Sequence, residues 1–146
     1  MTSQEVVVRS AGGKFRQEVT VGPHRMVVDE PASVGGSDAG PSPYGMLLAA
    51  LGSCTAMTLQ MYARTKGWPL ESVEVRLSHD KIHAKDCASC ETKEGKLDRI
   101  EREVIVGGPL TDEQRKRLGE IADRCPVHRT LASEIHVHTR MTTPAA

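Results

Sequence analysis

Three short segments near the N-terminus are rich in β-branched residues and are separated by glycine-containing turns: residues 4–9, 15–21 and 25–28. This pattern predicts a three-stranded antiparallel β-meander over residues 1–30. The following segment, residues 31–43, is rich in Pro, Gly and Ser and predicts a loop. Loops of this length are often functional or cross between structural units.

The longest apolar run in the chain predicts a central helix over residues 43–66. Ser42 is expected to cap its first turn, Pro43 suits the first helical position, and Gly67 suits the C-terminal cap. About 24 residues at about 1.5 Å each give a helix roughly 36 Å long. Small and apolar side chains surround most of it, which indicates a buried helix. The apolar stretch 46–59 is too short and too interrupted to predict a membrane span.

Two further segments downstream of this helix predict a long β-hairpin. Residues 72–83 alternate between apolar and polar side chains, as expected for a strand with one solvated face. Residues 97–106 form the second strand, and the polar residues 84–95 between them form the connecting loop.

The C-terminal third of the chain predicts a helix pair followed by a last strand. Thr111 and Gln114 form a capping-box pattern that opens a helix pair over residues 111–133. Residues 133–139 alternate in polarity and predict a strand. The complete order is βββ-α-ββ-αα-β without internal repeats, which is an α+β layout in a single domain over residues 1–146.

The composition suggests an oligomer and excludes some partners. Aromatic residues make up only 3% of the chain and hydrophobic residues 38%. A core this lean often gains apolar contact from a partner subunit. The 19 basic and 19 acidic residues balance and form no basic block, which argues against nucleic acid as a partner. The N-terminus lacks the features of a signal peptide, which favours the cytoplasm, where cysteines are more often catalytic, metal-bound or free than disulfide-bonded.

Two cysteines occur in contexts that differ from each other. Cys54 lies near the middle of the central helix, where a small buried side chain is the common role of cysteine, although Ser53 and Thr55 could donate hydrogen bonds to a thiolate. Cys125 precedes Pro126 and therefore occupies the expected N-cap of a short helix, where free N–H groups and cationic neighbours stabilise a thiolate. The alternative is a cysteine that merely ends one helix before another begins.

A second cysteine pair, Cys87 and Cys90, lies in the polar loop 84–95 as a Cys-x-x-Cys motif. Three interpretations are open: a zinc site with one or two further ligands, an auxiliary dithiol, or exposed cysteines without function. His79 and His83 lie about 13 Å apart on an extended strand, which suits a single tetrahedral zinc site poorly. Cys87 and Cys90 therefore remain the candidate metal ligands, and no cofactor is expected to be required.

The segment from Gly40 through Tyr44 into the helix around Cys54, followed far downstream by Cys125-Pro126-Val127-His128, resembles the OsmC/Ohr family of thiol-dependent peroxidases. The resemblance covers nearly the whole chain. It implies an intertwined homodimer in which antiparallel sheets wrap around two long central helices. It also implies a cofactor-free, cytoplasmic hydroperoxide reductase for oxidative and osmotic stress defence, with dithiols or lipoyl-bearing proteins as reductants.

The resemblance also implies roles for individual residues. Cys54 attacks the distal oxygen of an organic hydroperoxide, and the resulting sulfenic acid is resolved by Cys125 as a disulfide. We expect Tyr44, Leu47 and Leu51 to bind the substrate. An alternative function is a non-catalytic module that binds an apolar small molecule in the same pocket at the dimer interface.

One feature of the family is missing from this sequence. Members use an arginine from the N-terminal strands and a glutamate near the start of the central helix to polarise the thiolate and the peroxide. Arg16 is the expected arginine, with Arg9 and Arg25 as alternatives. The helix start carries no acid, and Asp38 or Glu30 are candidates to replace it.

Overall fold

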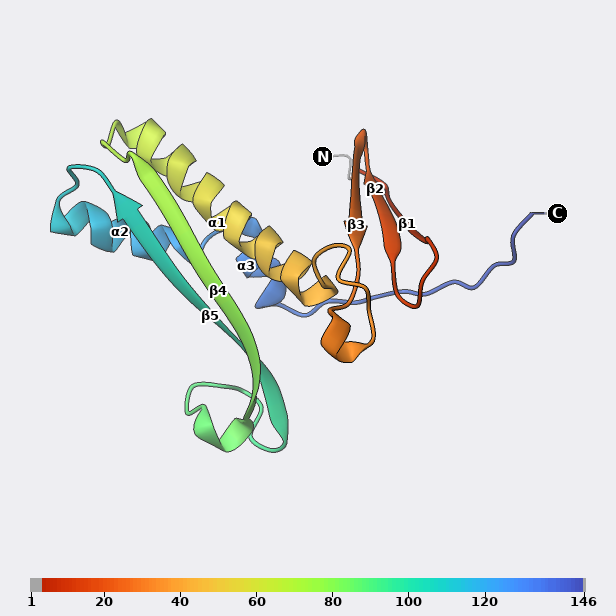
Figure 1. Cartoon of the computed structure of the whole chain (residues 1–146). Helices are drawn as coiled ribbons and strands as arrows, with labels where there is room; N and C mark the ends of the chain where they lie inside the picture. Colours follow the sequence, from red (N-terminus) through yellow and green to blue (C-terminus); the bar gives the residue numbers. More distant parts are fainter. Residues whose placement is uncertain (1–3, 146) are drawn as a thin grey trace. The chain divides into compact units, whose positions relative to one another are not determined.

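The computed structural model describes residues 4–145 of the chain (Figure 1). Antiparallel strands and one long helix give the α+β fold that the sequence predicts. The elements follow in the order β1 (Val6–Ser10), β2 (Gln17–Val21), β3 (His24–Val28), the 3-10 turn η1 (Ala32–Val34), α1 (Pro43–Lys66), β4 (Ser72–His83), the 3-10 turn η2 (Ala84–Asp86), β5 (Lys96–Gly107), α2 (Asp112–Ala122) and α3 (Pro126–Leu131).

The contacts within the chain divide it into two units. Unit 1 comprises residues up to 50 together with residues 77–101, and unit 2 comprises residues 51–76 together with the chain from residue 102 onward. Helix α1 and strands β4 and β5 each contribute residues to both units. The single domain expected from the sequence therefore stays a prediction.

The three N-terminal strands of unit 1 form an antiparallel sheet in the order β1-β2-β3, as the meander pattern predicts. Val19 of the central strand pairs with Val8 on one side and with Met26 on the other. Val19 and Val28 are the buried valines of this sheet, each with 8% of its surface exposed. Val19, Met26 and Val28 share one face of the sheet, whereas Val8 of the edge strand β1 is 57% exposed although it pairs with Val19.

The loop after β3 is organised around the carboxylate of Asp29, which is only 2% exposed. Its oxygens accept hydrogen bonds from the N–H groups of Ser37 at 3.2 Å and Ala39 at 3.1 Å. The hydrogen bond from Ala39 contributes most to holding the pKa of Asp29 below its usual value, against the opposing effect of burial. An ionised aspartate therefore folds this loop back toward the sheet.

Helix α1 begins and ends where its capping residues predict. Ser42 Oγ accepts a hydrogen bond from the Gly45 N–H at 3.1 Å, and Pro43 is the first helical residue. Gly67 follows the last turn with a φ of 69°, and the next N–H, that of Trp68, donates to Ala63 O at 2.9 Å. This is the glycine-terminated helix end that the sequence indicates.

Among residues 4–145, α1 is also the one helix whose length and apolar composition would suffice to cross a membrane, with a mean hydropathy of 1.3 over its most apolar window. The shorter stretch 46–59 alone does not reach that length. Core helices of globular proteins meet the same criterion, so composition does not distinguish the two roles.

The core of unit 2 forms where α1 meets α2. Leu59 of α1 has no exposed surface and packs with Leu118, Ile121 and Ala122 of α2. Trp68, which follows the end of α1, packs against this cluster and contacts the Tyr62 ring edge-on at 5.4 Å between centroids. The remaining partly buried members of this core come from the strands and connections: Leu70, Val73, Val104, Val106 and Leu110.

Helix α2 starts at the capping box predicted from the sequence. Thr111 Oγ1 accepts from the Gln114 N–H at 3.1 Å, and Gln114 Oε1 accepts from the Thr111 N–H at 2.9 Å. These reciprocal bonds satisfy N–H groups that a helix start otherwise leaves unpaired. The cap thereby fixes where α2 begins.

The strand predicted over residues 133–139 is absent from the described structure, and this prediction was wrong for the single chain. A β-strand needs a neighbouring strand to pair with its backbone. Neither the three-stranded sheet nor the β4-β5 pair includes this segment. The apolar residues of the alternation, Ile135 and Val137, are instead 55% and 78% exposed.

Candidate active site

Cys125 occupies the N-cap of α3, as the sequence predicts. Its backbone has φ −63° and ψ 142°, an extended conformation, and Pro126 is the first residue of the helix. The Cys125 Sγ accepts a hydrogen bond from the His128 N–H at 3.3 Å. The thiol is completely buried. The helix start therefore offers a backbone donor to the sulfur in the place where a serine or aspartate oxygen usually caps a helix.

Thr55 of α1 also contacts the same sulfur. Its hydroxyl oxygen lies 3.7 Å from Cys125 Sγ, and it donates its own proton to the carbonyl oxygen of Leu51 at 2.7 Å. Thr55 has no exposed surface. A hydroxyl has one proton and two lone pairs, so in this arrangement Thr55 accepts from the Cys125 thiol. When Cys125 ionises, the hydroxyl proton can turn toward the sulfur.

Arg102 of β5 places a positive charge beside Thr55 and Cys125. Its guanidinium donates to Thr55 Oγ1 at 3.1 Å, to Asp123 Oδ1 at 2.8 Å and to His128 Nδ1 at 3.1 Å. The Arg102 side chain is only 12% exposed, whereas Asp123 is 68% exposed. Arginine can only donate hydrogen bonds, so His128 Nδ1 accepts this one. A neutral His128 ring therefore carries its proton on Nε2.

These neighbours act on the acidity of Cys125. Burial raises the pKa of the thiol, and it is the largest single effect. Hydrogen bonds from the His128 N–H, from Thr55 and from Cys54, together with the charge of Arg102, outweigh burial and hold the pKa of Cys125 below the usual value. A buried thiol is thus kept in a site that favours its thiolate.

Cys54 is the hydrogen-bonding neighbour of Cys125 that comes from the middle of α1. Both cysteines are free, and Cys54 is half-buried, whereas Cys125 is buried. The structure therefore brings together the two cysteines that lie 71 residues apart in the sequence. They differ in access to solvent, and the more accessible one is Cys54.

The residues expected to bind substrate fall in different surroundings. Leu51 is buried in unit 2, with 4% of its surface exposed, and its carbonyl accepts the Thr55 proton. Tyr44 and Leu47 belong to unit 1 and are 53% and 37% exposed. The Tyr44 ring stacks on His79 with 4.5 Å between centroids. Their role in binding substrate stays a prediction.

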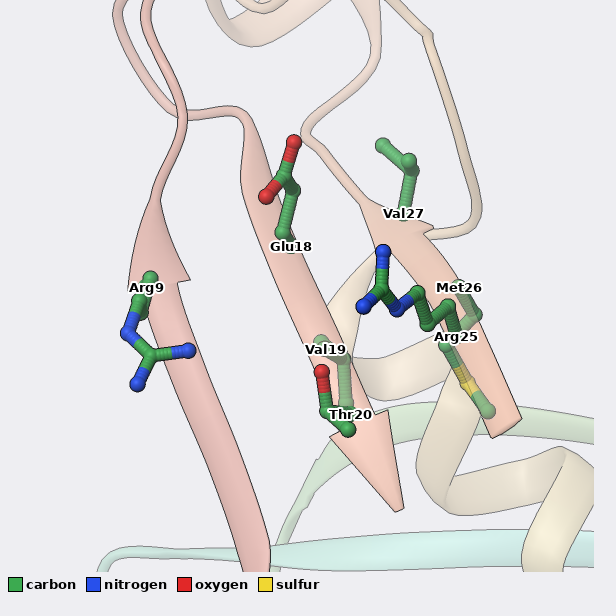
Figure 2. A pocket seen from close by; sticks show the side chains of 7 residues that line it. All are labelled: Arg9, Glu18, Val19, Thr20, Arg25, Met26 and Val27. Carbon is green, nitrogen blue, oxygen red and sulfur yellow. The ribbon is translucent and has the colours of Figure 1, made fainter. Parts of the chain in front are cut away.

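The three arginines proposed from the sequence all belong to unit 1. Arg16 acts on Asp29, whose pKa its charge helps to lower. Arg9 and Arg25 lie on neighbouring strands with Glu18 of β2 and line a cavity of about 320 Å³ on the sheet (Figure 2). The arginine found next to the thiol pair within unit 2 is Arg102, so the action of Arg16 on Cys54 stays a prediction.

Sequence reasoning missed Arg102, and a signal for it was present. Along β5 the partly buried positions alternate with exposed ones, and Arg102 falls in phase with Ile100, Val104 and Val106. A charged residue at an inward position of a strand needs a polar partner. The proposed replacements for the missing helix-start acid, Glu30 and Asp38, are joined by an Asp38 N–H to Glu30 O hydrogen bond in unit 1.

Cys87 and Cys90 form a disulfide, with 5.5 Å between their Cα atoms. A disulfide has no thiolate to bind zinc, so the structure does not support these residues as metal ligands in this state. Among the residues described, no group of three His, Cys, Asp or Glu side chains is placed to hold a metal. His79 instead bonds to Asp98 at 2.8 Å. The auxiliary dithiol is the interpretation that agrees with the disulfide.

Comparisons with a family model and with solved structures agree on the fold of this chain. The family model described as OsmC-like protein matches residues 35–140. The OsmC-like protein of Mycoplasma pneumoniae superposes with a TM-score of 0.69 at 16% identity, covering 90% of this chain and 88% of the other. An organic hydroperoxide resistance protein OsmC from Legionella pneumophila gives 0.63 at 17% identity, with 90% and 91% coverage.

The organic hydroperoxide resistance protein OhrB of Bacillus subtilis gives a TM-score of 0.60 at 18% identity, with 88% of this chain and 90% of that chain covered. A search of curated protein sequences finds no match. At identities this low, the structural likeness establishes a common fold and leaves the chemistry to be argued from the residues.

Proposed function

Since the chain belongs to the family of OsmC-like proteins, we propose that it is a cysteine-based peroxidase that reduces organic hydroperoxides with Cys54 and Cys125. The observation that carries the proposal is the pairing of a half-buried cysteine with a buried one whose sulfur is hydrogen-bonded on several sides. Two structurally similar proteins are named organic hydroperoxide resistance proteins, which supports the substrate class.

The proposed first step takes place at Cys54. Its thiolate attacks the distal oxygen of the hydroperoxide, the O–O bond breaks, and the departing alkoxide takes a proton and leaves as an alcohol. Cys54 becomes a sulfenic acid. The exposure of the two thiols supports this order, because a peroxide can reach half-buried Cys54 but not Cys125 without movement of the chain.

The proposed second step makes use of the low pKa of Cys125. The Cys125 thiolate attacks the Cys54 sulfur, hydroxide leaves and is protonated to water, and a disulfide forms. An external dithiol then attacks the accessible Cys54 sulfur, and Cys125 departs as a stabilised thiolate. The second thiol of the reductant loses its proton and attacks the mixed disulfide, which releases Cys54 and oxidises the reductant to a disulfide. Thiols of low pKa leave faster in such exchanges. Cys125, the thiol with the lowered pKa, is therefore better suited to resolving the sulfenic acid and leaving from the disulfide than to attacking the hydroperoxide.

Arg102 is proposed as a positioning residue in this chemistry. It acts through Thr55 and through its charge on Cys125, since no contact of Arg102 with Cys54 is involved. Its bonds to Asp123 and His128 hold the guanidinium in one orientation. It thereby supports the thiolate of the resolving cysteine in a setting from which most solvent is excluded.

The proposed active form is a homodimer, supported by exposed apolar side chains on α1. Leu47, Met57 and Met61 form an apolar stripe along one side of this helix. Met57 and Met61 are 61% and 69% exposed in the single chain. A second copy related by a two-fold axis would bury this stripe on both helices. It would also offer a partner for the apolar alternation of residues 133–139.

The test is rapid-mixing oxidation of protein in which Cys87 and Cys90 are both replaced by alanine. Free thiols are counted, and only Cys54 and Cys125 contribute to the count. With cumene hydroperoxide we expect two thiols to be lost. Cys125→Ser should lose one and yield a sulfenic acid that dimedone traps, and Cys54→Ser should lose none. Undiminished thiol loss in Cys54→Ser, or no faster loss with cumene hydroperoxide than with hydrogen peroxide, would reject the assignment.

A further inference from the structure

Two links close the loop between β4 and β5: a backbone hydrogen bond at its base and a disulfide farther along the loop. At its base the Ala84 N–H donates to Gly95 O at 2.8 Å, and the Ala84 side chain is 2% exposed. Further out, Cys87 and Cys90 form a disulfide across a sequence separation of three. Figure 1 shows this loop at the end of the β4-β5 hairpin. The sequence alone left the function of this pair open.

A role as a structural staple does not account for this disulfide. In the chain-entropy model, the stabilisation by a disulfide increases with the length of chain that it closes. The segment between Cys87 and Cys90 contains only Ala88 and Ser89, and backbone bonds already close the hairpin at Ala84. Opening the disulfide would therefore leave the β4-β5 pairing in place.

The disulfide is accessible to a reactant. Both cysteines are half-buried, and both line a cavity of about 550 Å³. Ile82, Leu97 and Ile100 contribute apolar side chains to its lining. Thiol–disulfide exchange requires the attacking sulfur to approach along the line of the S–S bond. The cavity that both cysteines line leaves room for a reactant beside the bond, which a fully buried disulfide lacks.

Polar groups around the cavity differ at the two sulfurs. Ser89 Oγ lies 3.9 Å from Cys87 Sγ, where its hydroxyl can donate to a departing thiolate. On the other side Lys93 donates to the Cys90 carbonyl oxygen at 2.8 Å and orders that end of the turn. The hydroxyl favours Cys87 as the leaving sulfur, which makes Cys90 the sulfur under attack.

We propose that Cys87 and Cys90 form a second redox site, at which an external dithiol exchanges two electrons with the loop disulfide. One thiolate of the dithiol attacks Cys90, and Cys87 leaves as a thiolate that takes up a proton. The second thiol of the reductant loses its proton and attacks its own mixed disulfide, which releases Cys90. The loop gains two electrons and two protons, and the reductant becomes a disulfide. The site does not require Cys54 or Cys125.

The experiment uses the full chain with Cys54→Ser and Cys125→Ser, so that only the loop pair titrates. The folded protein is equilibrated with mixtures of reduced and oxidised dithiothreitol and with glutathione mixtures as reference. Free thiols are alkylated and counted by mass spectrometry. We expect both thiols to appear together in one two-electron transition in the folded protein, at glutathione ratios that leave structural disulfides closed.

Brief exposure of the closed loop disulfide in this background to reduced glutathione identifies the attacked sulfur. The thiol released by the attack is alkylated at once, and peptide mapping by mass spectrometry locates the bound glutathione. We expect it on Cys90 several-fold more often than on Cys87. Equal amounts, or more glutathione on Cys87, would overturn the assignment of Cys90. Because this background lacks the proposed peroxidase cysteines, failure here is separate from failure of the peroxidase proposal.

Two results would overturn the redox site as a whole. The first is a disulfide that opens only when urea unfolds the chain, together with a large loss of thermal stability in the Cys87→Ala and Cys90→Ala double variant, since both are properties of a staple. The second is stoichiometric zinc bound by the reduced pair, measured by metal analysis after incubation with zinc alone, which would make the pair a metal site.

Discussion

The hydroxyl oxygen of Thr55 lies 3.7 Å from the sulfur of Cys125, although the two residues are separated by 70 positions in the sequence. The contact joins the middle of the long helix to the start of a short one. Both side chains are fully buried, so water does not compete for their hydrogen bonds. The acidity of the cysteine therefore depends on a residue of another helix, and substitutions at Thr55 test that dependence.

Replacing Thr55 by valine, which has the same shape, should raise the pKa of Cys125 toward its ordinary value. The substitution removes the hydroxyl that hydrogen-bonds to the thiolate and accepts from Arg102. The measurement is a titration of thiolate ultraviolet absorbance in protein lacking the other three cysteines. Thr55→Ser keeps the hydroxyl and should retain the lowered pKa. An unchanged pKa in Thr55→Val would contradict the role given to this hydroxyl.

Replacing Arg102 by glutamine should slow the formation of the Cys54–Cys125 disulfide several-fold and leave formation of the sulfenic acid unchanged. The reason is that Arg102 acts on Cys125 through its charge and through Thr55. Loss of charged hydrogen bonds by a mostly buried side chain should also lower the free energy of unfolding by about 1–3 kcal/mol. Single-turnover kinetics with a sulfenic-acid probe separate the two steps.

Arg102→Lys is the matched control for charge. A lysine keeps the positive charge but does not reproduce the forked geometry of the guanidinium, so it should recover part of the resolution rate. A variant that slows both chemical steps equally would show that Arg102 acts on the whole site and would contradict its assignment to Cys125.

The lowered pKa of Cys125 predicts how stability changes with pH. In the unfolded chain this thiol titrates near pH 8.5, and in the folded chain it titrates lower. Between the two values the unfolded state binds more protons, so the free energy of unfolding rises with pH over that interval. The contribution is complete above the unfolded pKa and is lost as the pH falls through the folded pKa.

Urea unfolding of the reduced protein at a series of pH values, compared with Cys125→Ser, isolates this contribution. The difference between the two proteins should grow from neutral pH toward about pH 8.5. A difference that is constant or shrinks with rising pH would mean that the folded protein does not favour the thiolate.

Substituting Met57 by aspartate should convert the proposed homodimer to monomers. Met57 is 61% exposed in the single chain and lies in the apolar stripe of α1, so a buried unpaired charge would oppose association. Gln60→Asp, placed on the same helix but outside the stripe, adds the same charge and should leave association intact. Sedimentation analysis at several protein concentrations distinguishes these outcomes, and a monomeric parent protein would rule out the dimer.

Leu59→Ala should lower the free energy of unfolding by about 2–5 kcal/mol. Leu59 has no exposed surface and packs with Leu118 and Ile121 at the centre of unit 2. Leu59→Met keeps most of the volume and should cost less than about 1.5 kcal/mol. Urea denaturation measures both variants. Equal losses for alanine and methionine would indicate that packing at this position is not what stabilises the core.

The helices and their ends could be predicted because their signals are local. Ser42, Gly67 and Thr111 act on N–H and C=O groups within a few residues, and the pattern of the chain around them specifies those bonds. The N-cap position of Cys125 could be predicted for the same reason, since Pro126 marks the first helical residue. The pairing of Cys54 with Cys125 came only from family resemblance.

Features that depend on distant partners could not be derived from local patterns. The inward phase of Arg102 along β5 indicates a polar partner, but no local pattern identifies that partner, because other elements bring Thr55 and Cys125 to it. The alternation of residues 133–139 predicted a strand, but a strand also depends on a partner strand, and this segment pairs with neither sheet of the described chain. The two-residue spacing between Cys87 and Cys90 was compatible with a zinc site, with an auxiliary dithiol and with cysteines that have no function.

The guanidinium of Arg102 bonds to three separate segments: Thr55 in α1, Asp123 after α2 and His128 in α3. The same residue thus helps to lower the pKa of Cys125 and connects the helices that surround it. Mutations that relax the reactivity of this thiol will also loosen the assembly of unit 2. Evolution of a new thiol chemistry on this scaffold would therefore have to rebuild part of its tertiary structure at the same time.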